Sequence, residues 1–304
     1  MINPPHSGIV VVGSANMDVV FSVERIPVPG ETLIADSVAK YPGGKGLNQA
    51  VAAARSGGDT VFVGALGADE NGDELFATMS DSGIDSTLVR RVDVESGQAF
   101  IVVADSAENT IIVASGANAE VMALTAEERD RVTSSAVLLA QLELPLEVVI
   151  ESAREARAAG TTVMLNAAPA RALPDELIDI LDYLIVNEHE ACLLGGSDDL
   201  AEASVRLAAR VPQVIVTLGA EGSVLYQGGR ELARVPARRV MAIDTTGAGD
   251  TYCGAFATAI AAGRGLTDAA AFATAASALS VQKLGAVPSI PARDRIDAML
   301  GEPL

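Results

Sequence analysis

Residues 244–250 hold two glycines and two carboxylates directly before a predicted helix at 251–262. They read Asp-Thr-Thr-Gly-Ala-Gly-Asp. Gly247 and Gly249 allow the backbone to turn sharply and to come close to a ligand. The helix that follows directs free N–H groups and the positive end of its dipole back at that turn. The segment therefore predicts an anion hole suited to a phosphate group.

Asp250, the last residue of this segment, has two interpretations. An Asp at the start of a helix is usually an N-cap. In the floor of a glycine-built anion site, however, a carboxylate is well placed to accept the proton of an attacking hydroxyl. The surrounding glycines favour a general base, and the cap stays open as the alternative.

A second cluster, residues 42–49, reads Pro-Gly-Gly-Lys-Gly-Leu-Asn-Gln and opens the first predicted helix. Lys45 supplies a cation between glycines, and Asn48 supplies both donors and an acceptor. A sugar carries a hydroxyl on nearly every carbon, so its recognition needs such directional groups. The alternative is an ordinary glycine-rich turn.

Polar side chains also follow two predicted strands. Asn16 and Asp18 come just after the first strand, and Glu143 comes after the strand at 136–141. Open α/β sheets bind their ligands at the carboxyl ends of strands. We therefore expect these groups in a binding site. The alternatives are a turn residue for Asp18 and a solvated loop acid for Glu143.

Two further segments follow strands later in the chain. Residues 187–190, Asn-Glu-His-Glu, offer hard oxygen ligands that suit Mg²⁺ with its phosphates, and His189 is interpreted as a bystander. Residues 217–222, Thr-Leu-Gly-Ala-Glu-Gly, form a glycine-bracketed loop able to lie flat against an adenine or ribose. On its own, this loop could also be a turn that ends a strand.

Two common nucleotide motifs are absent from the sequence. No G-x-x-x-x-G-K-[ST] occurs, so a nucleotide enzyme of this sequence would not be of the P-loop type. No G-x-G-x-x-G follows the first strand, which weakens a dinucleotide-binding interpretation.

The elements that must position these residues alternate between strand and helix. Short apolar runs predict strands at 8–13, 60–64, 136–140, 161–165, 183–186 and 214–217. Helical stretches are predicted at 47–55, 71–82, 146–159, 174–180 and near Glu190. This order predicts an α/β fold with a mostly parallel sheet, helices on both faces and right-handed crossovers. A hairpin is expected at 224–235 around Gly228 and Gly229.

Two stretches, at 18–41 and 87–115, break this alternation. They contain extended segments without an intervening helix. We expect a small antiparallel sheet that forms a lid over the mouth of one domain spanning residues 1–304. The alternative is that these stretches are edge strands of the same sheet.

Composition limits the partners. The 304 residues are 49% apolar and carry 21 basic against 40 acidic side chains, a net charge of -19. Such a field repels nucleic acid and anionic membranes, so neither is expected as a partner. Cys192 and Cys253 lie too far apart in sequence for a zinc or disulfide pattern, which favours a reducing compartment. Residues 1–6 lack signal-peptide features, and the most apolar stretch, 253–262, is too short to span a bilayer. The sequence predicts a soluble, cytoplasmic protein.

With both glycine-rich motifs in place, the sequence resembles the PfkB family of carbohydrate kinases. The resemblance runs from Gly13 to Pro291 and includes the pieces at 116–118, 141–143 and 166–170. The G-G-K-G-x-N-Q form, together with Gly-Ser-Ala-Asn-Met-Asp at 13–18, is closest to the branch that acts on D-ribose.

The resemblance implies a ribokinase-like three-layer fold and ATP-dependent phosphorylation of D-ribose at its 5-hydroxyl. Asp250 would be the base, and Gly247, Ala248 and Gly249 would supply N–H groups to the anion hole. Residues that would hold the sugar are Asn16, Met17, Asp18, Gly44, Lys45, Gly46, Leu47, Asn48, Glu143 and Asp250. Residues that would contact ATP are Asn187, Thr217, Leu218, Gly219, Ala220, Glu221, Gly222, Gly249, Asp250 and Thr274.

The resemblance also implies cations and a partner. Glu190 would help to place Mg²⁺ indirectly. An activating K⁺ would bind at Asp244, Thr246, Ser280, Lys283, Gly285 and Ser289, several of them through main-chain carbonyls. The lid would pair two subunits in a homodimer.

Three residues depart from the family pattern: Thr274 replaces a His or Asn near the adenine, and Leu47 and Met17 are bulkier than usual. The last two could narrow the sugar pocket or repack behind it. Alternative functions are a PfkB kinase for deoxyribose, fructose or adenosine, and a sugar-sensing protein without turnover. A nicotinamide oxidoreductase is compatible with the fold class but lacks the fingerprint.

Overall fold

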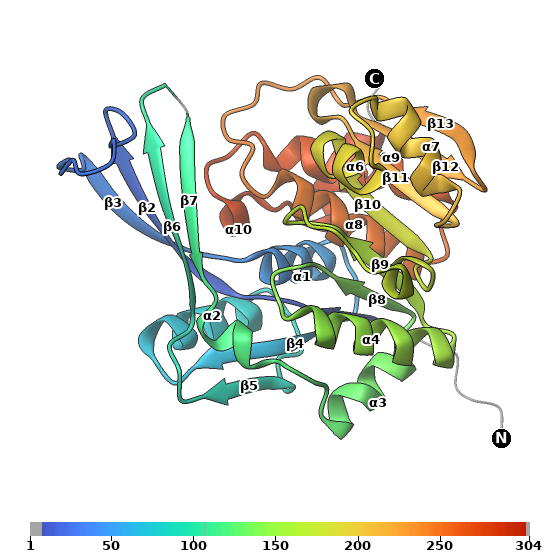
Figure 1. Cartoon of the computed structure of the whole chain (residues 1–304), viewed down its shortest axis with the longest axis horizontal. Helices are drawn as coiled ribbons and strands as arrows, with labels where there is room; N and C mark the ends of the chain where they lie inside the picture. The colour runs from blue at the N-terminus through green and yellow to red at the C-terminus, as the bar shows by residue number, and fades with distance from the viewer. Residues whose placement is uncertain (1–7, 107, 302–304) are drawn as a thin grey trace.

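Two β-sheets organise the chain (Figure 1). The computed structural model describes residues 8–106 and 108–301, so the expectation for residues 1–6 lies outside the described residues. A nine-stranded sheet has the order β13-β12-β11-β10-β9-β8-β1-β4-β5, and a four-stranded sheet has the order β3-β2-β6-β7.

The large sheet is parallel from β11 to β5, and β12 and β13 add an antiparallel hairpin at one edge. Its strands are β1 (Ile9–Val12), β4 (Thr60–Gly67), β5 (Val89–Val92), β8 (Val137–Ala140), β9 (Thr162–Asn166), β10 (Tyr183–Asn187), β11 (Gln213–Thr217), β12 (Ser223–Gln227) and β13 (Arg230–Val235). The predicted mostly parallel sheet and its hairpin are confirmed. The central strands of this sheet, such as β1, are continuous apolar runs, because helices cover both faces of the sheet.

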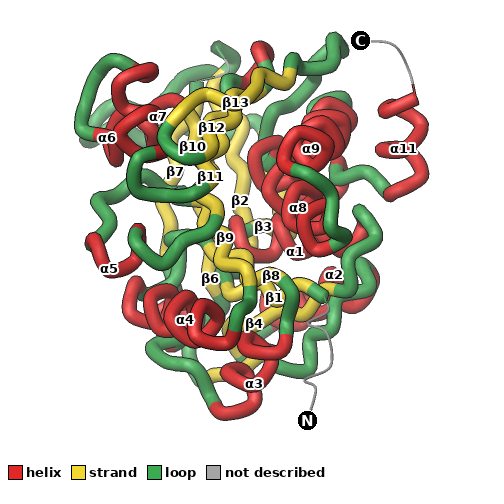
Figure 2. The backbone as a smooth tube through the Cα atoms, turned by 90° about the vertical axis from the view of Figure 1, so that its right-hand side faces the viewer, coloured by secondary structure: helices red, strands yellow, loops and turns green. Residues whose placement is uncertain are grey.

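Helices cover both faces of this sheet (Figure 2). One layer holds α1 (Lys45–Arg55), α2 (Glu70–Asp81), α8 (Ala248–Ala261) and α9 (Leu266–Ser280). The other holds α4 (Leu146–Ala159), α5 (Asp175–Ile178), α6 (Glu188–Gly195) and α7 (Leu200–Ala208). The remaining helices are α3 (Ala126–Ser134), α10 (Ala286–Ser289), α11 (Arg293–Gly301) and the 3₁₀ turns η1 (Gly116–Glu120) and η2 (Gly219–Glu221).

The core divides into two apolar clusters, one under each helix layer. Along β1, Ile9 and Val11 join the cluster beneath α1 and α8, whereas Val10 and Val12 join the cluster beneath α4. This alternation is the two-residue period of a strand buried on both sides.

The four-stranded sheet projects away from the rest of the molecule and is formed by β2 (Asn16–Val23), β3 (Ser37–Gly43), β6 (Gly97–Ala104) and β7 (Asn109–Ala114) (Figure 1). The predicted small second sheet is therefore present, and we keep the name lid for its four strands, but it differs from the prediction in two ways. Its central pair, β2 and β6, is parallel, whereas the two outer pairs are antiparallel. The stretch at 89–92 is β5, which pairs with β4 at the edge of the large sheet. For these residues the alternative prediction, an edge strand of the same sheet, is therefore confirmed.

Two helix starts meet at the carboxyl edge of the large sheet, where β8, β9, β10 and β11 end. Helices α1 and α8 pack closely because Gly254 has no side chain: a Cβ there would lie 2.2 Å from the carbonyl oxygen of Gln49. This contact sets residues 45–49 against residues 247–250. Among the described residues, no helix has the length and apolar character needed to cross a membrane.

Candidate active site

Asp250 is the third residue of α8, and its side chain is 8% exposed. Its Oδ2 accepts a hydrogen bond from Asn48 Nδ2 at 3.0 Å, and its Oδ1 accepts one from Gln49 Nε2 at 2.9 Å. The N-cap of α8 is Gly247, and no side chain caps it. The alternative reading of Asp250 as a helix cap is therefore wrong, because the carboxylate bonds to α1 and not to the first turn of its own helix.

Gly247 and Gly249 differ in whether the backbone requires glycine at their positions. Gly247 has a φ of 71°, in the left-handed region that favours glycine. Gly249 has an ordinary helical backbone, and a Cβ there would meet nothing within 4 Å. The fold itself therefore does not require glycine at 249, and the open space beside it is where a ligand can approach.

Two cavities share this space beside Gly249. The smaller one, of about 160 Å³, is lined by Lys45, Asn166, Ala168, Ile185, Val186, Asn187, Glu190, Thr217, Gly247, Gly249, Asp250 and Cys253. The larger one, of about 420 Å³, lies between the loop after β11, the segment at 237–248 and the facing sides of α8 and α9. One cavity therefore contains the acid and the lysine, and the other is the wider space next to them, with five alanines and two valines among its 17 lining residues.

The glycines of residues 43–46 allow a tight fit between α1 and the strand ends. A Cβ at Gly43 would lie 2.2 Å from Asp18 Oδ2, and one at Gly46 would lie 2.4 Å from Ser14 N. Gly44 has a φ of 88° and would place a Cβ 2.7 Å from Asn16 N. The cluster is therefore not an ordinary turn, because it brings Lys45 and Asn48 up against the residues that follow β1.

Asp18 and Glu143 meet beside this helix start. Glu143 Oε2 accepts hydrogen bonds from Ser14 Oγ at 2.5 Å and from Lys45 N at 3.0 Å. It is therefore not a solvated loop acid. Asp18 lies within β2 and not in a turn. Burial, followed by the charges of Glu143 and Asp250, raises the pKa of Asp18 to about 7.

Among the described residues, Lys45 is the one basic side chain that lines the smaller cavity. Burial would lower its pKa, but the nearby carboxylates of Asp250, Glu143 and Glu190 outweigh burial and raise the pKa of Lys45. In return Lys45 stabilises the ionised form of Asp250, although burial keeps the pKa of Asp250 raised. The ammonium is thus held charged beside the acid.

Three of the residues that are predicted to bind the sugar have side chains that contact other parts of the protein. Asn16 Oδ1 accepts a hydrogen bond from Asn118 Nδ2 at 2.8 Å, which leaves its own amide N–H groups for other partners. Met17 and Leu47 are both fully buried in the apolar cluster beneath α1 and α8. Their bulk is therefore accommodated in the core, and a contact of either with a ligand stays a prediction.

Asn187 and Glu190 form a capping box at the start of α6. Asn187 Oδ1 accepts from Glu190 N at 2.8 Å, and Glu190 Oε2 accepts from Asn187 N at 2.9 Å. Both also line the smaller cavity. The box uses the oxygen of Asn187 and Oε2 of Glu190, so Glu190 Oε1 takes no part in it. No group of three or more His, Cys, Asp or Glu side chains in the described ranges is arranged to hold a metal.

The loop after β11 lines the larger cavity with Thr217, Gly219, Ala220 and Gly222. It is not merely a turn that ends a strand. Leu218 instead packs on the core, and Glu221 does not line either cavity. Thr274 lines the far wall, where its buried hydroxyl oxygen has no hydrogen-bond partner in the structure. An unpaired buried hydroxyl in an apolar cavity suits a ligand that brings its own polar group.

The predicted K⁺ residues lie on two adjoining segments, the loop before α8 and the stretch from the end of α9 to the end of α10. Asp244 Oδ1 accepts from Thr246 N at 2.9 Å, and Asp244 Oδ2 accepts from Gly285 N at 2.7 Å. Ser280 and Ser289 donate to main-chain carbonyls at 2.8 and 2.7 Å. Lys283 lies between them and donates its N–H to the carbonyl of Ser280 at 3.1 Å. Carboxylate, hydroxyl and carbonyl oxygens are the donor set that a hard cation prefers.

Sequence reasoning assigned no role to several residues at the site. Gln49, Gln141 and Asn166 form a buried amide network with Asp250, and Arg238 and Arg239 line the larger cavity. The available signal for the network was a polar pair, Asn48 and Gln49, inside an otherwise apolar helix.

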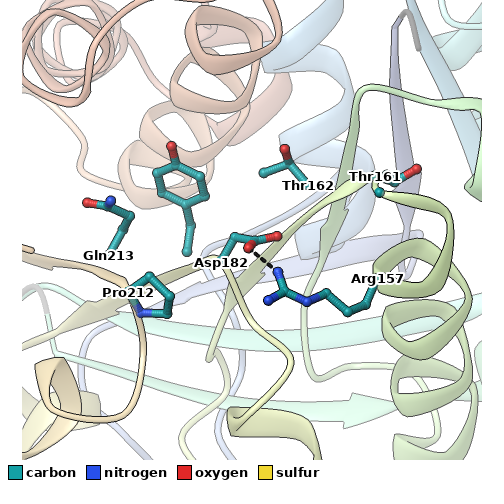
Figure 3. A pocket seen from close by; sticks show the side chains of 8 residues that line it. Arg157, Thr161, Thr162, Asp182, Pro212 and Gln213 are labelled. Carbon is teal, nitrogen blue, oxygen red and sulfur yellow. Dashed lines mark hydrogen bonds and ion pairs between the residues drawn. The ribbon is translucent and has the colours of Figure 1, made fainter. Parts of the chain in front are cut away.

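A third cavity, of about 440 Å³, lies at the opposite, amino edge of β9, β10 and β11 (Figure 3). It is lined by Arg157, Gly160, Thr161, Thr162, Asp182, Tyr183, Pro212 and Gln213, and an Arg157–Asp182 ion pair crosses it. None of the predicted site residues belongs to it.

A buried carboxylate, a nearby lysine and an open glycine-rich helix start around one cavity suit a phosphotransferase for hydroxyl compounds, and comparison with known proteins gives the family. The profile of the pfkB family carbohydrate kinases matches residues 7–293. The chain belongs to that family.

The similar proteins match over nearly the whole chain. A ribokinase of Haemophilus influenzae is 41% identical over 93% of this chain and 95% of its own length. A ribokinase of Staphylococcus aureus is 38% identical over 95% of this chain and 98% of its own length. The structure of Arabidopsis thaliana ribokinase complexed with ribose and ATP superposes with a TM-score of 0.92 at 34% identity, covering 98% of this chain and 99% of that one.

Proposed function

We propose that the protein transfers the γ-phosphoryl group of ATP to the 5-hydroxyl of D-ribose. The observation that carries this proposal is the buried Asp250 carboxylate, which faces the same cavity as Lys45 and the open backbone at Gly249. Curated relatives of 38% and 41% identity are ribokinases, and the neighbouring Arabidopsis structure holds ribose and ATP.

In this proposal Asp250 removes the proton of the sugar hydroxyl as the oxygen attacks phosphorus. Burial raises the pKa of Asp250, while Lys45 and two amides favour the ionised carboxylate that this step needs. The N–H groups of Gly247, Ala248 and Gly249 would hold the oxygens of the migrating group at the positive end of α8. Positioning and charge stabilisation are the main needs of phosphoryl transfer.

The sugar would bind between α1 and the lid. Asp18, Lys45, Asn48 and Glu143 supply acceptors and donors on one side of Asp250, and Gly44 allows the sugar to approach the backbone. Asn16 would use its free amide hydrogens. The lid would exclude water, which competes as a phosphoryl acceptor.

The nucleotide would occupy the 420 Å³ cavity. Its lining of Ala220, Ala237, Val240, Ala278 and Val281 suits the faces of a purine. The hydroxyl of Thr274 would then gain the partner it lacks in the described structure.

Two cations would complete the site. Mg²⁺, placed through water by Glu190 and Asn187, would neutralise phosphate charge, and K⁺ at the loops of Asp244 and Ser280 would polarise the anion hole. The acidic and carbonyl oxygens described above fit both ions.

We further propose a homodimer formed through the lid. Ile111, Ile112 and Val113 of β7 are 53%, 65% and 47% exposed, and Val38 of β3 is 57% exposed. Exposed apolar side chains on the two edge strands of a small sheet favour pairing with another copy. Because the reaction consumes ATP, we propose that the protein is located in the cytoplasm. We also propose that it is a single domain with an inserted lid.

The test is ADP formation from ATP with ribose, deoxyribose, fructose or adenosine, each with and without K⁺. We expect the highest kcat/KM with ribose and a higher rate with K⁺ than with Na⁺. A higher kcat/KM with another acceptor would reassign the substrate. No acceptor-dependent ADP formation would indicate a sensing protein.

A further inference from the structure

A chain of side-chain amides connects the main chain of β10 to Asp250. Asn166 Nδ2 donates to the carbonyl of Ile185 at 3.2 Å. Gln49 Nε2 donates to Asn166 Oδ1 at 3.0 Å and to Asp250 Oδ1 at 2.9 Å. Gln141 Nε2 donates to Gln49 Oε1 at 2.7 Å. Both N–H groups and the oxygen of the Gln49 amide are therefore occupied.

The direction of every bond in this chain is fixed by one main-chain carbonyl. The Ile185 oxygen can only accept, so Asn166 must turn its Nδ2 toward it and its Oδ1 toward Gln49. Gln49 must then present its Nε2 to Asn166 and hence to Asp250. The amide cannot rotate to offer its oxygen to Asp250 without breaking three hydrogen bonds.

Packing alone does not require amides here. Gln49 and Gln141 are 0% and 1% exposed, and Gln49 lies on α1 among Ala50, Val51 and Ala52 of the apolar core. Buried amides are costly unless they are hydrogen-bonded, and an apolar side chain would fill the same space. Gln49 lines neither of the two cavities beside Asp250, so it does not contact a ligand there.

We propose that Gln49 is a positioning residue that holds the Asp250 carboxylate ionised and in a single orientation before the sugar binds. Its Nε2 can only donate, so a proton on Oδ1 would break the bond from Gln49, just as a proton on Oδ2 would break the bond from Asn48. The inference rests on the proposed function, in which Asp250 is the base.

Other ionisable groups also act on Asp250. They are Lys45 on α1, Glu143 after β8, Glu190 on α6, Cys253 on α8 and Asp18 on β2. Replacing Gln49 by Met removes the donor and changes none of these charges. A shift in the titration of Asp250 can therefore be assigned to the lost hydrogen bond.

The direct test is a carboxyl ¹³C NMR titration of Asp250 in the substrate-free full chain, with the resonance assigned by its loss in Asp250→Asn. In Gln49→Met we expect the pKa of Asp250 to rise by about one to two units, the effect of one hydrogen bond to a charged acceptor. The matched control is Gln213→Met, which removes a partly buried amide at the opposite edge of the sheet (Figure 3) and should shift nothing. An unchanged titration in Gln49→Met would overturn the proposal.

A kinetic cycle separates positioning from a merely structural role. We expect Gln49→Met to lower kcat by about ten- to a hundredfold in the native background, and by no more than about twofold when Asp250 is already Asn. An equal loss in both backgrounds would show that Gln49 does not act through Asp250. If the native protein forms no ADP with ribose, the proposed function fails, while the NMR titration still decides the role of Gln49.

A second variant covers the case in which Gln49→Met does not fold. Gln141→Met leaves the donor to Asp250 in place but frees the oxygen of Gln49. We expect a smaller rise in the pKa of Asp250 and a folded protein with a lower melting temperature, because the buried oxygen of Gln49 loses its donor. A folded Gln141→Met protein with an unshifted titration would contradict the proposal.

Discussion

Asp18 and Asp250 are two carboxyl groups of the candidate site, one half-buried and one buried, whose surroundings differ. Asp250 accepts two amide hydrogen bonds and lies near Lys45, which together oppose the effect of burial. For Asp18, burial and the charges of Glu143 and Asp250 prevail, and its pKa rises to about 7. Burial therefore raises the pKa of both groups, and at Asp250 the two side-chain amides oppose that rise.

The pKa of Asp18 predicts a pH-dependent affinity for the sugar. Above pH 7 the carboxylate can accept hydrogen bonds from two hydroxyls, whereas below pH 7 it carries a proton and loses acceptor capacity. We expect the KM for ribose to rise as the pH falls from 8 to 6, by up to about tenfold per pH unit below the pKa.

The matched control for this prediction is Asp18→Asn, which cannot titrate. It should raise the KM for ribose at all pH values and abolish the pH dependence, with the KM for ATP unchanged. A pH profile for ribose that persists in Asp18→Asn would assign the titration to another group.

At the level of residues, the sequence predicted Asp250, Lys45, Asn48 and the glycines because each belongs to a short local motif. Gln49 received no role from the sequence, although it adjoins Asn48. Its function depends on Gln141 and Asn166, which lie 92 and 117 positions away, and no local pattern specifies such contacts.

At the scale of elements, helix α8 contains two glycines, Gly254 and Gly249, at which a substitution is expected to have different consequences. Gly254 permits the close contact with α1, whereas Gly249 faces open space next to both cavities. A methyl group at 254 would therefore disturb the fold, and one at 249 would meet only a ligand.

We predict that Gly249→Ala folds normally and loses nucleotide affinity. Alanine suits a helical backbone better than glycine, so the melting temperature should not fall. The added methyl group would crowd a phosphate and weaken ATP binding by at least about tenfold. Thermal unfolding and calorimetric titration with ATP would measure both effects.

Gly301→Ala provides the control, because Gly301 is also helical with nothing within 4 Å of an added Cβ and lies far along the chain in α11. It should leave ATP binding unchanged. Native ATP affinity in Gly249→Ala would remove the helix start from the nucleotide site.

The elements were predicted well where one strand and one helix alternate locally. Two features of the lid were not predictable in this way. The parallel pairing of β2 with β6 joins residues about 80 positions apart, and nothing local in either strand sets its direction. Residues 89–92 read as part of the lid, yet they pair in parallel with β4 at the edge of the large sheet, a partner that no local pattern specifies.

For the molecule as a whole, a net charge of -19 has to be reconciled with binding a polyanion and with self-association. Local features, such as Lys45 and the helix start, can attract phosphate despite that field. Two copies that approach through the lid would repel each other over distances comparable to the screening length.

We therefore predict a lid-mediated dimer that is stronger at high salt. Ile112→Asp, at an exposed apolar position of β7, should convert the dimer to a monomer of 31.1 kDa in sedimentation equilibrium, whereas raising the salt concentration should favour the native dimer. Leu232→Asp on β13, which is 50% exposed and outside the lid, is the control and should stay dimeric. A native monomer at all salt concentrations would contradict the proposed pairing.

The central claim is that Asp250 removes the proton of the sugar hydroxyl, and Asp250→Asn tests it most directly. Asparagine keeps the size of the side chain, so the variant should fold and bind ATP with native affinity. Its turnover with saturating ribose and ATP should fall by at least about two orders of magnitude, the usual contribution of a general base. A turnover within a few-fold of the native value, in a variant that binds both substrates, would contradict the account.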